Sequence, residues 1–255
     1  MYVFRAAWRL ALLLGYFLRF GIELVIHRYA DRAERAEWLH RFCRTAVHGL
    51  GINVTVEGTF PDAGAVISNH LSYVDIVLFA ALHPCVFCAK AEIEKWPVIG
   101  WMTTMSGAVF IERGRGGSAL RARSGMQAAA EAGLPVVFFP EGTTSDGSVV
   151  LPFHSGLLAQ AMVVDQSITP ACLSYTLQGE NPEGYTARNS VAWGDDKPLP
   201  LHILRFLGLR EVHAHVTFAA QPLMLGSDVK DRKAAAIKAQ AAVLSLSTGI
   251  AKTSS

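Results

Sequence analysis

From residue 51 onward, short apolar runs alternate with longer amphipathic segments, and this alternation constrains the fold more than any other feature. The apolar runs have the length of strands, and the segments between them show the three- and four-residue spacing of helices. Strands separated by helices are typical of a mostly parallel sheet flanked by helices, so we predict an α/β fold of that kind. The expected strands are 53–57, 65–67, 86–89, 108–112, 135–139, 168–177 and 212–218. The expected helices are 73–82, 97–105, 118–132, 156–164 and 228–246.

The first fifty residues are predicted to form two helices ahead of this α/β body, the second of them over 31–50. In the first helix, the uninterrupted apolar stretch Leu10–Leu18 is shorter than the roughly twenty residues that cross a bilayer. Extending it to 8–26 encloses Arg9 and Glu23, so an amphipathic helix lying on or tilted in the membrane surface fits better than a span. A signal peptide is the alternative, but no small-residue cleavage site follows the apolar run.

Charge and composition also indicate contact with lipid. Residues 1–44 contain eight arginines, no lysine and four acids, so this segment carries +4 and the rest of the chain −2. A basic, apolar segment suits an anionic membrane surface, although a solvated helix face has the same pattern. The chain is 51% apolar and only 17% charged, whereas freely soluble enzymes carry roughly a quarter charged residues. We therefore divide the chain into membrane-associated helices at 1–50 and one domain at 51–255.

The cysteines and histidines do not predict a metal site. Cys85 and Cys88 have the spacing of half a zinc site, but a structural zinc needs about two further ligands and no second pair follows. Their apolar flanks favour two buried thiols in or beside a strand, and the absence of a disulfide framework indicates a reducing compartment. His213 and His215 point to one face of a strand with only Glu211 nearby, which favours a solvated strand face.

His70 and Asp75 are the first candidate catalytic residues. His70 follows the strand 65–67 directly, at the end of a strand where open α/β sheets bind their ligands, and Asp75 lies about one turn into the next helix. This spacing brings the carboxylate to one imidazole nitrogen and leaves the other free to accept a proton. The alternative is a capping box, with Ser72 at the N-cap of the helix and Asp75 three residues later.

Two further polar clusters stand at the ends of expected strands. The strand 108–112 delivers Arg113, and a guanidinium binds phosphate through two parallel hydrogen bonds. A surface arginine paired with Glu112 is the alternative. The strand 135–139 stops at Pro140, and the Glu-Gly-Thr turn that follows offers backbone N–H groups and hydroxyls to a phosphate or an oxyanion. A capped surface turn is the alternative there.

In this order, the clusters resemble the motifs of the PlsC-type glycerolipid acyltransferases, the 1-acylglycerol-3-phosphate acyltransferase family. Four blocks carry the resemblance: the family's catalytic H-x4-D motif, its acceptor-binding strand, its glutamate-glycine block and its proline-containing motif. In this sequence they lie at 69–75, 107–113, 139–143 and 168–171. One such block alone is a weak signal, but four in register over residues 65–175 are specific.

The resemblance implies a mechanism. His70 is the general base that deprotonates the hydroxyl of a lysolipid, and Asp75 orients it. The oxygen then attacks the thioester of acyl-CoA or acyl-carrier protein, and no metal, bound cofactor or nucleic acid is expected to take part. The resemblance assigns the acceptor's head group to four residues: Arg113, Glu141, Gly142 and Thr143. Such an enzyme is expected at the cytoplasmic face of the inner membrane, where the helices at 1–50 contact the bilayer.

Two positions that bear on the acceptor depart from the phosphatidate-forming pattern. Thr144 stands where arginine is common, and His154 where a basic residue, commonly lysine, follows a phenylalanine. Arg113 favours 1-acyl-sn-glycerol-3-phosphate, giving phosphatidic acid, and the two departures favour lyso-ornithine lipid as the alternative. A non-catalytic lipid-binding protein is a third interpretation, which the intact His70–Asp75 pair disfavours. Further candidate site residues are Asn69, Lys90, Thr144 and His154.

Overall fold

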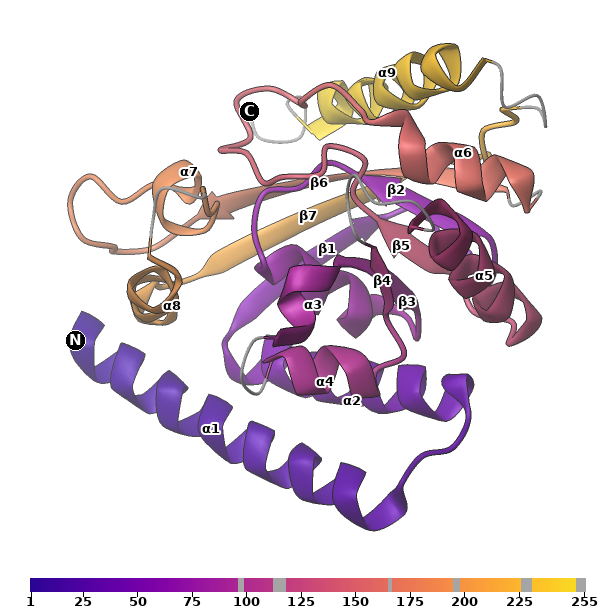
Figure 1. Cartoon of the computed structure of the whole chain (residues 1–255). Helices are drawn as coiled ribbons and strands as arrows, with labels where there is room; N and C mark the ends of the chain where they lie inside the picture. Colours follow the sequence, from indigo (N-terminus) through magenta and orange to yellow (C-terminus); the bar gives the residue numbers. More distant parts are fainter. Residues whose placement is uncertain (96–98, 112–117, 165–166, 195–197, 226–230, 251–255) are drawn as a thin grey trace.

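The computed structural model describes residues 1–95, 99–111, 118–164, 167–194, 198–225 and 231–250. Within these ranges, seven strands form one sheet in the order β1-β7-β6-β2-β5-β3-β4, with helices on both faces (Figure 1). The strands are β1 (Ile52–Glu57), β2 (Ala65–Ser68), β3 (Val86–Lys90), β4 (Val109–Ile111), β5 (Val136–Phe138), β6 (Ile168–Leu177) and β7 (Val212–Phe218). Each lies where the apolar pattern predicts a strand.

Every neighbouring pair of strands is parallel except β6 and β7, which are antiparallel. The predicted mostly parallel α/β sheet is therefore confirmed. The carboxyl ends of β2, β5 and β3 lie on one edge of the sheet, because these three strands run in the same direction. The loops that carry the first and third polar clusters leave β2 and β5, which are direct neighbours, and so begin side by side.

The helices form two layers (Figure 1). One layer contains α5 (Ser118–Glu131), α6 (Ser155–Val163) and α9 (Arg232–Ile250), and the other contains α1 (Tyr2–His27), α2 (Arg32–Gly49), α3 (Val74–Leu82) and α4 (Ile99–Met105). Three short helical elements were not predicted: η1 (Ala91–Lys95), α7 (Ala187–Ser190) and α8 (Leu199–Gly208). The sequence of α8 begins Leu-Pro-Leu, which resembles a loop, but proline in the first helical turn loses no intrahelical hydrogen bond.

The first fifty residues share a hydrophobic core with the rest of the chain. Trp38 of α2 is fully buried, stacks on Phe42 and donates a hydrogen bond from Nε1 to the carbonyl of Phe20 in α1. These side chains belong to the same core cluster as Phe79 of α3 and Val216 of β7. The apolar face of α2 is therefore directed into the α/β body, and α1 packs on the outside of it.

α1 spans 26 residues, which is longer than the predicted apolar run because its arginines do not interrupt the helix. By length and composition it is sufficient to cross a membrane. Its N-terminal half is bound to the end of α8: the Tyr2 hydroxyl donates to the carbonyl of Arg205 (2.7 Å), Arg5 Nε to that of Gly208 (2.9 Å), and Arg9 Nη1 to that of Leu209 (2.6 Å). These donors satisfy carbonyls that have no partner within α8 itself.

Candidate active site

His70 and Asp75 form a hydrogen-bonded pair at the carboxyl end of β2. His70 Nδ1 lies 2.8 Å from Asp75 Oδ2. The Asp75 side chain is fully buried, whereas the His70 side chain is 16% exposed. Because the carboxylate accepts from Nδ1, the neutral ring carries its proton there, and Nε2 keeps the lone pair that can accept a proton. The prediction that the side chains of His70 and Asp75 are in contact is therefore confirmed.

Four donors surround the Asp75 carboxylate. Oδ2 accepts hydrogen bonds from the backbone N–H groups of Leu71 (2.6 Å) and Ser72 (2.9 Å) in addition to His70, and Oδ1 accepts from the hydroxyl of Tyr175 (2.8 Å). A buried carboxylate is stable as an anion only with such partners. The alternative capping box is half formed: the Asp75 carboxylate accepts from the Ser72 N–H, but Tyr73 is the N-cap of α3, and Ser72 Oγ has no hydrogen-bond partner among the described residues.

The glutamate-glycine block lies directly against His70. The Phe139 ring stacks on the imidazole with 4.0 Å between the ring centroids and 10° between the planes. The backbone N–H of Ser145 donates to the carbonyl of His70 at 2.9 Å. Between them the chain turns at Gly142, whose φ of +69° lies in the left-handed region that favours glycine. The stack and the backbone hydrogen bond hold the two loops together, so the third cluster borders the first.

Glu141 is 2% exposed, and neither of its carboxyl oxygens has a hydrogen-bond partner in the described part of the chain. Burial raises the pKa of Glu141 to about 8, and the charge of Asp75 contributes to the rise. The backbone N–H groups of Leu151 and His70 face the carboxyl and oppose this rise, although neither makes a hydrogen bond of good geometry. The carboxyl is therefore protonated at neutral pH. Its assignment to the acceptor's head group stays a prediction, and in the structure the side chain lies beneath the surface.

The remaining predicted head-group residues lie at different depths. Gly142, Thr143 and Thr144 are half-buried in the loop beside His70. His154 is exposed at the N-cap of α6, and its backbone N–H donates to the carbonyl of Pro140 (2.8 Å), which ties it to the same loop. The structure thus places the 139–145 loop beside His70, whereas the His154 side chain lines a separate pocket with Lys233 and Ile237 of α9. Contact of either with an acceptor stays a prediction.

The predictions on the second cluster are tested only in part. The strand is observed as β4, which pairs with β3, but Glu112 and Arg113 lie outside the described residues. Lys90 is the last residue of β3, and only its backbone is described. The Arg32 side chain of α2 donates to the carbonyl of Gly107 (2.6 Å), so the entry to β4 is held by the N-terminal helices. The assignment of Arg113 to the acceptor's head group stays a prediction.

Asn69 has a structural role that the sequence does not reveal. Its Nδ2 donates to the carbonyl of Leu173 (2.9 Å), and its Oδ1 accepts from the backbone N–H of the same residue (2.8 Å). The side-chain amide thereby continues the pairing of β2 with β6 beyond the last residue of β2. Tyr175, two residues further along β6, was missed altogether. Only its place in a strand of otherwise small or aliphatic residues marks it in the sequence.

The other titratable clusters have ordinary partners. No group of three or more His, Cys, Asp or Glu side chains that could hold a metal is found among the described residues. His213 faces the Asn53 amide, with 3.3 Å between Nε2 and Nδ2, and His215 Nε2 lies 3.3 Å from a carboxylate oxygen of Glu57. All four cysteines are free thiols; Cys85 is buried, as predicted, whereas Cys88 in β3 is only half-buried.

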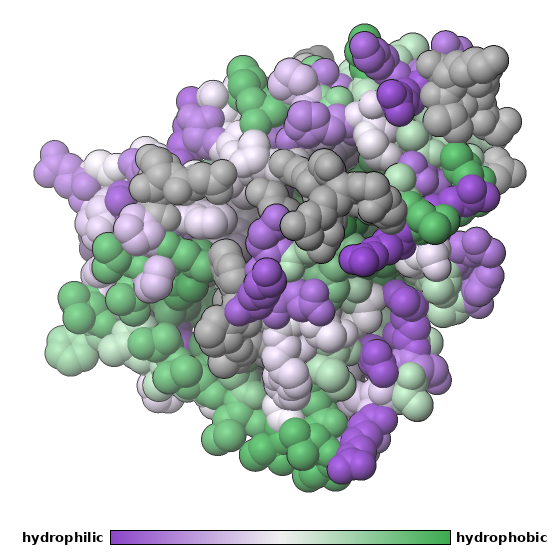
Figure 2. All heavy atoms as spheres, in the orientation of Figure 1, coloured by the Kyte–Doolittle hydropathy of each residue, from purple (hydrophilic) through white to green (hydrophobic). Residues whose placement is uncertain are grey.

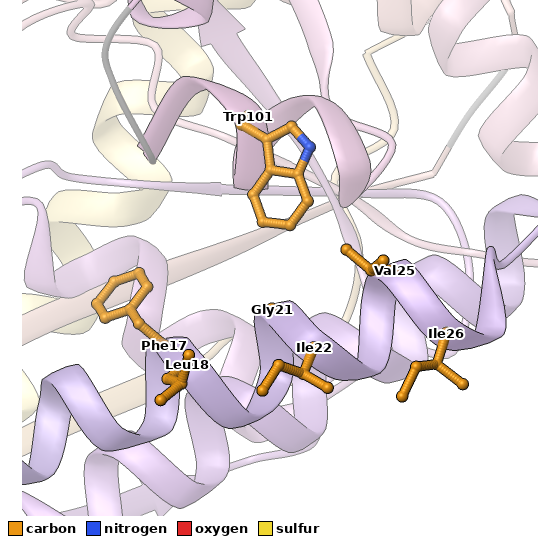
Figure 3. Close-up of a pocket in the computed structure, with 7 residues that line it drawn as sticks. All are labelled: Phe17, Leu18, Gly21, Ile22, Val25, Ile26 and Trp101. Carbon is orange, nitrogen blue, oxygen red and sulfur yellow. The ribbon is translucent and has the colours of Figure 1, made fainter.

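A separate apolar pocket lies between α1 and α4, with a volume of about 340 Å³. Figure 3 shows the indole of Trp101, from α4, directed toward α1 near Gly21, where an added Cβ would lie 3.9 Å from the ring. Its lining residues are Phe17, Leu18, Gly21, Ile22, Val25, Ile26 and Trp101. Neither His70 nor Asp75 lines it, so this pocket is distinct from the catalytic pair.

Comparison with known proteins agrees with the site. An acyltransferase family model matches residues 51–174, which include the catalytic pair and the glutamate-glycine block. The lyso-ornithine lipid O-acyltransferase of Rhodobacter capsulatus is 35% identical over 214 residues, covering 80% of this chain and 73% of the relative. The chain belongs to the glycerolipid acyltransferase family. The lyso-ornithine lipid O-acyltransferase of Brucella abortus is 29% identical over 241 residues, covering 89% of this chain and 90% of the relative.

Other glycerolipid acyltransferases are similar over shorter stretches or in fold. The 1-acyl-sn-glycerol-3-phosphate acyltransferase of Neisseria meningitidis is 32% identical over 158 residues, covering 62% of this chain and 60% of the relative. The crystal structure of PlsC, the 1-acyl-sn-glycerophosphate acyltransferase of Thermotoga maritima, superimposes with a TM-score of 0.60 over 93% of this chain and 95% of that one. Its sequence identity is 20%, so it confirms the fold alone.

Proposed function

We propose that this protein transfers a fatty acyl group from acyl-CoA or acyl-carrier protein to the hydroxyl of lyso-ornithine lipid. The observation that carries the chemistry is the His70–Asp75 pair, with Nδ1 bound to a fully buried carboxylate at 2.8 Å and Nε2 on the unbound side of the ring. A base positioned in this way can activate a substrate hydroxyl without a nucleophile from the protein.

In the proposed reaction, His70 Nε2 removes the proton of the acceptor hydroxyl as its oxygen attacks the thioester carbonyl. Asp75 stabilises the imidazolium that forms, because its carboxylate already accepts from Nδ1. The tetrahedral intermediate then collapses, an ester bond replaces the thioester bond, and the leaving thiolate takes the proton back from Nε2. The Phe139 ring, stacked on the imidazole, keeps the ring plane fixed during both proton transfers.

The choice of acceptor rests on two observations. Two similar relatives that cover most of this chain are named lyso-ornithine lipid O-acyltransferases. In addition, Thr144 and His154 stand at positions where phosphatidate-forming members carry Arg and, commonly, Lys, and Thr144 precedes Ser145, whose N–H binds the His70 carbonyl. A phosphate monoester has up to two negative charges to neutralise, whereas an ornithine head group carries an amine as well as a carboxylate. An acceptor site with fewer cations therefore suits the ornithine lipid better.

The second candidate acceptor is 1-acyl-sn-glycerol-3-phosphate, which the sequence analysis placed first. The similarity to the Neisseria meningitidis enzyme and the presence of Arg113 favour it. A side-by-side assay separates the two: thiol release from acyl-CoA is measured with each lysolipid in mixed micelles. We expect kcat/KM to be at least about tenfold higher with lyso-ornithine lipid, and equal or higher values with the phosphate acceptor would overturn the proposal.

The same positions supply a gain-of-function prediction. Thr144→Arg combined with His154→Lys is expected to raise kcat/KM for the phosphate acceptor by about a hundredfold or more, because each of the two charge-assisted hydrogen bonds contributes roughly 1.5–3 kcal/mol. Thr176→Arg combined with His48→Lys adds the same cations at exposed positions and is the matched control. Equal gains in both double variants would show that general charge, not the head-group site, determines the preference.

We further propose that α1 lies on the membrane together with α8. The exposed apolar side chains of α1 lie along its outer side, where Figure 2 shows hydrophobic residues gathered over this helix. They are Val3, Phe4, Trp8, Leu14, Leu18, Ile22, Val25 and Ile26. Leu201 and Leu204 of α8 are exposed as well. The hydrogen bonds from Arg5 and Arg9 to the end of α8 argue against a span, because a crossing α1 would abandon them.

This orientation predicts that Leu14→Glu combined with Leu18→Glu weakens binding to anionic phospholipid vesicles by at least about tenfold. Each exposed leucine inserted into the membrane contributes roughly 1.5–3 kcal/mol, and the added carboxylates are repelled by anionic lipid. Vesicle flotation measures the effect. Leu120→Glu combined with Leu244→Glu places the same changes on α5 and α9, which lie on the opposite face, and is expected to leave binding unchanged.

A further inference from the structure

Tyr175 of β6 contacts the catalytic carboxylate from a point 100 residues away in the sequence. Its hydroxyl donates to Asp75 Oδ1 at 2.8 Å, while Oδ2 accepts from His70 and from two backbone N–H groups. Among the described residues, the Tyr175 hydroxyl is the hydrogen-bond donor to Asp75 Oδ1. We infer that Tyr175 is a positioning residue for acyl transfer: it fixes the rotation of the carboxylate so that Oδ2 stays directed at His70 Nδ1. This inference rests on the proposed function.

The scaffold behind Tyr175 is rigid. β6 is paired on both sides, with β2 and with β7, and the Asn69 amide binds both backbone groups of Leu173, two residues before the tyrosine. The catalytic loop is therefore held to β6 twice, once through Asn69 and once through Asp75. A carboxylate that is held at both oxygens cannot rotate about its Cβ–Cγ bond without breaking hydrogen bonds in a buried site, where unpaired polar atoms are costly.

The titratable groups around the pair keep the phenol a donor. Burial raises the pKa of Tyr175 well above its ordinary value of 10.0, and the negative charge of Asp75 and the hydrogen bond to it raise it further. Among described residues, Tyr73 also interacts electrostatically with Tyr175, and Glu141 with Asp75, and burial raises the pKa of each. In this set Glu141 has the pKa nearest neutrality, at about 8. Any effect of Tyr175 on the acid side of the pH profile is therefore separate from the titration of Glu141.

The test is Tyr175→Phe, which removes the hydroxyl and keeps the ring. We expect kcat to fall about tenfold with KM for acceptor and donor unchanged within about twofold, because the change affects the base and not the substrate contacts. We also expect the acid limb of the kcat profile to move up by about one pH unit. With one donor fewer on the carboxylate, the His70–Asp75 pair takes up a proton more readily.

Tyr29→Phe is the matched control, since the Tyr29 hydroxyl also donates to a carboxylate, that of Glu23, but in the connection between α1 and α2. It is expected to leave kcat and the acid limb unchanged. A second comparison sets the Asp75→Asn variant beside the double variant Asp75→Asn, Tyr175→Phe. Neither protein has a carboxylate at position 75, so removing the tyrosine hydroxyl leaves no buried charge unpaired. If Tyr175 acts through Asp75, the double variant is no slower than Asp75→Asn alone.

A readout that needs no substrate separates this inference from the proposed function. In the ¹⁵N-histidine NMR spectrum, the Nδ1 proton of His70, assigned with His70→Gln, is expected to exchange faster with water in Tyr175→Phe than in wild type or Tyr29→Phe. A wild-type enzyme inactive on every lysolipid would overturn the proposed function, whereas the proton-exchange result would still stand. Unchanged exchange, an unchanged acid limb, or a further loss in the double variant would each overturn the role of Tyr175.

Discussion

Replacing His70 with alanine is expected to lower kcat for acyl transfer by about three orders of magnitude, because a positioned general base contributes roughly 10²–10⁴-fold. In the proposed reaction Nε2 of this ring takes the acceptor's proton, and the other three donors around Asp75, two backbone N–H groups and the Tyr175 hydroxyl, offer no replacement base. Thiol release from acyl-CoA, followed at saturating lysolipid, measures the loss. KM for the acceptor is expected to change little, since the residues predicted to bind the head group are unaltered.

Two controls make this result specific. His48→Ala removes an exposed histidine in the last turn of α2 and is expected to retain wild-type kcat. Adding imidazole to the His70→Ala variant is expected to restore part of the rate, because the vacated space beside Phe139 can receive a free ring. A His70→Ala protein that keeps its fold and acylates lysolipid at the wild-type rate would refute the assignment of the base.

The second large effect concerns Glu141 and the pH dependence of stability. Burial raises the pKa of Glu141 from 4.5 to about 8, so the folded state holds the proton more tightly than the unfolded state. The stability that the protonated carboxyl provides is complete below about pH 4.5 and is lost as the pH rises to about 8. In Glu141→Gln the side chain is uncharged at every pH. We expect the variant to be more stable than wild type at pH 9, and this difference in free energy of unfolding to be roughly 2–5 kcal/mol larger at pH 9 than at pH 5.

This difference is measured by denaturant unfolding of both proteins in the same detergent at several pH values. Because the two proteins share every other titratable group, the contributions of those groups cancel in the difference. Glu180→Gln, at an exposed loop position, is the control and is expected to follow wild type at every pH. If the Glu141→Gln and wild-type curves stay parallel from pH 5 to pH 9, the carboxyl is not protonated in the folded state. At pH 5 the two proteins are expected to be similarly stable, because both side chains are then uncharged.

The strands of the sheet could be predicted from the sequence because each one is a compact apolar run bounded by turn residues. The order of the strands and the antiparallel pairing of β6 with β7 could not be predicted. β7 alternates strictly between apolar and polar residues, and that pattern is the same whether its neighbour β6 runs parallel or antiparallel to it. The helix α8 escaped prediction because its C-terminal end is bound by side chains of α1, about 200 residues away, and no local signal records that contact.

The catalytic pair could be predicted because His70 and Asp75 are five residues apart, so local geometry alone brings them together. The rest of the site depends on contacts across the fold. The partner on Asp75 Oδ1 comes from β6, and the protonation of Glu141 follows from burial that only the assembled sheet and loops create. Ser72 gave a plausible cap in the sequence, but the carboxylate of Asp75 binds the Ser72 N–H while the hydroxyl stays unpaired in the described structure.

The attachment of α1 to α8 bears on how this enzyme can be prepared without detergent. Trimming the N-terminus is a common route to water-soluble forms of membrane enzymes, but here it would strip Tyr2, Arg5 and Arg9 from the backbone carbonyls that end α8. The Tyr2 ring also packs so closely on Gly208 that any added side chain there would overlap it. The helix is thus a structural part of the enzyme, and solubilisation is better sought by polar replacement of its outward residues than by truncation.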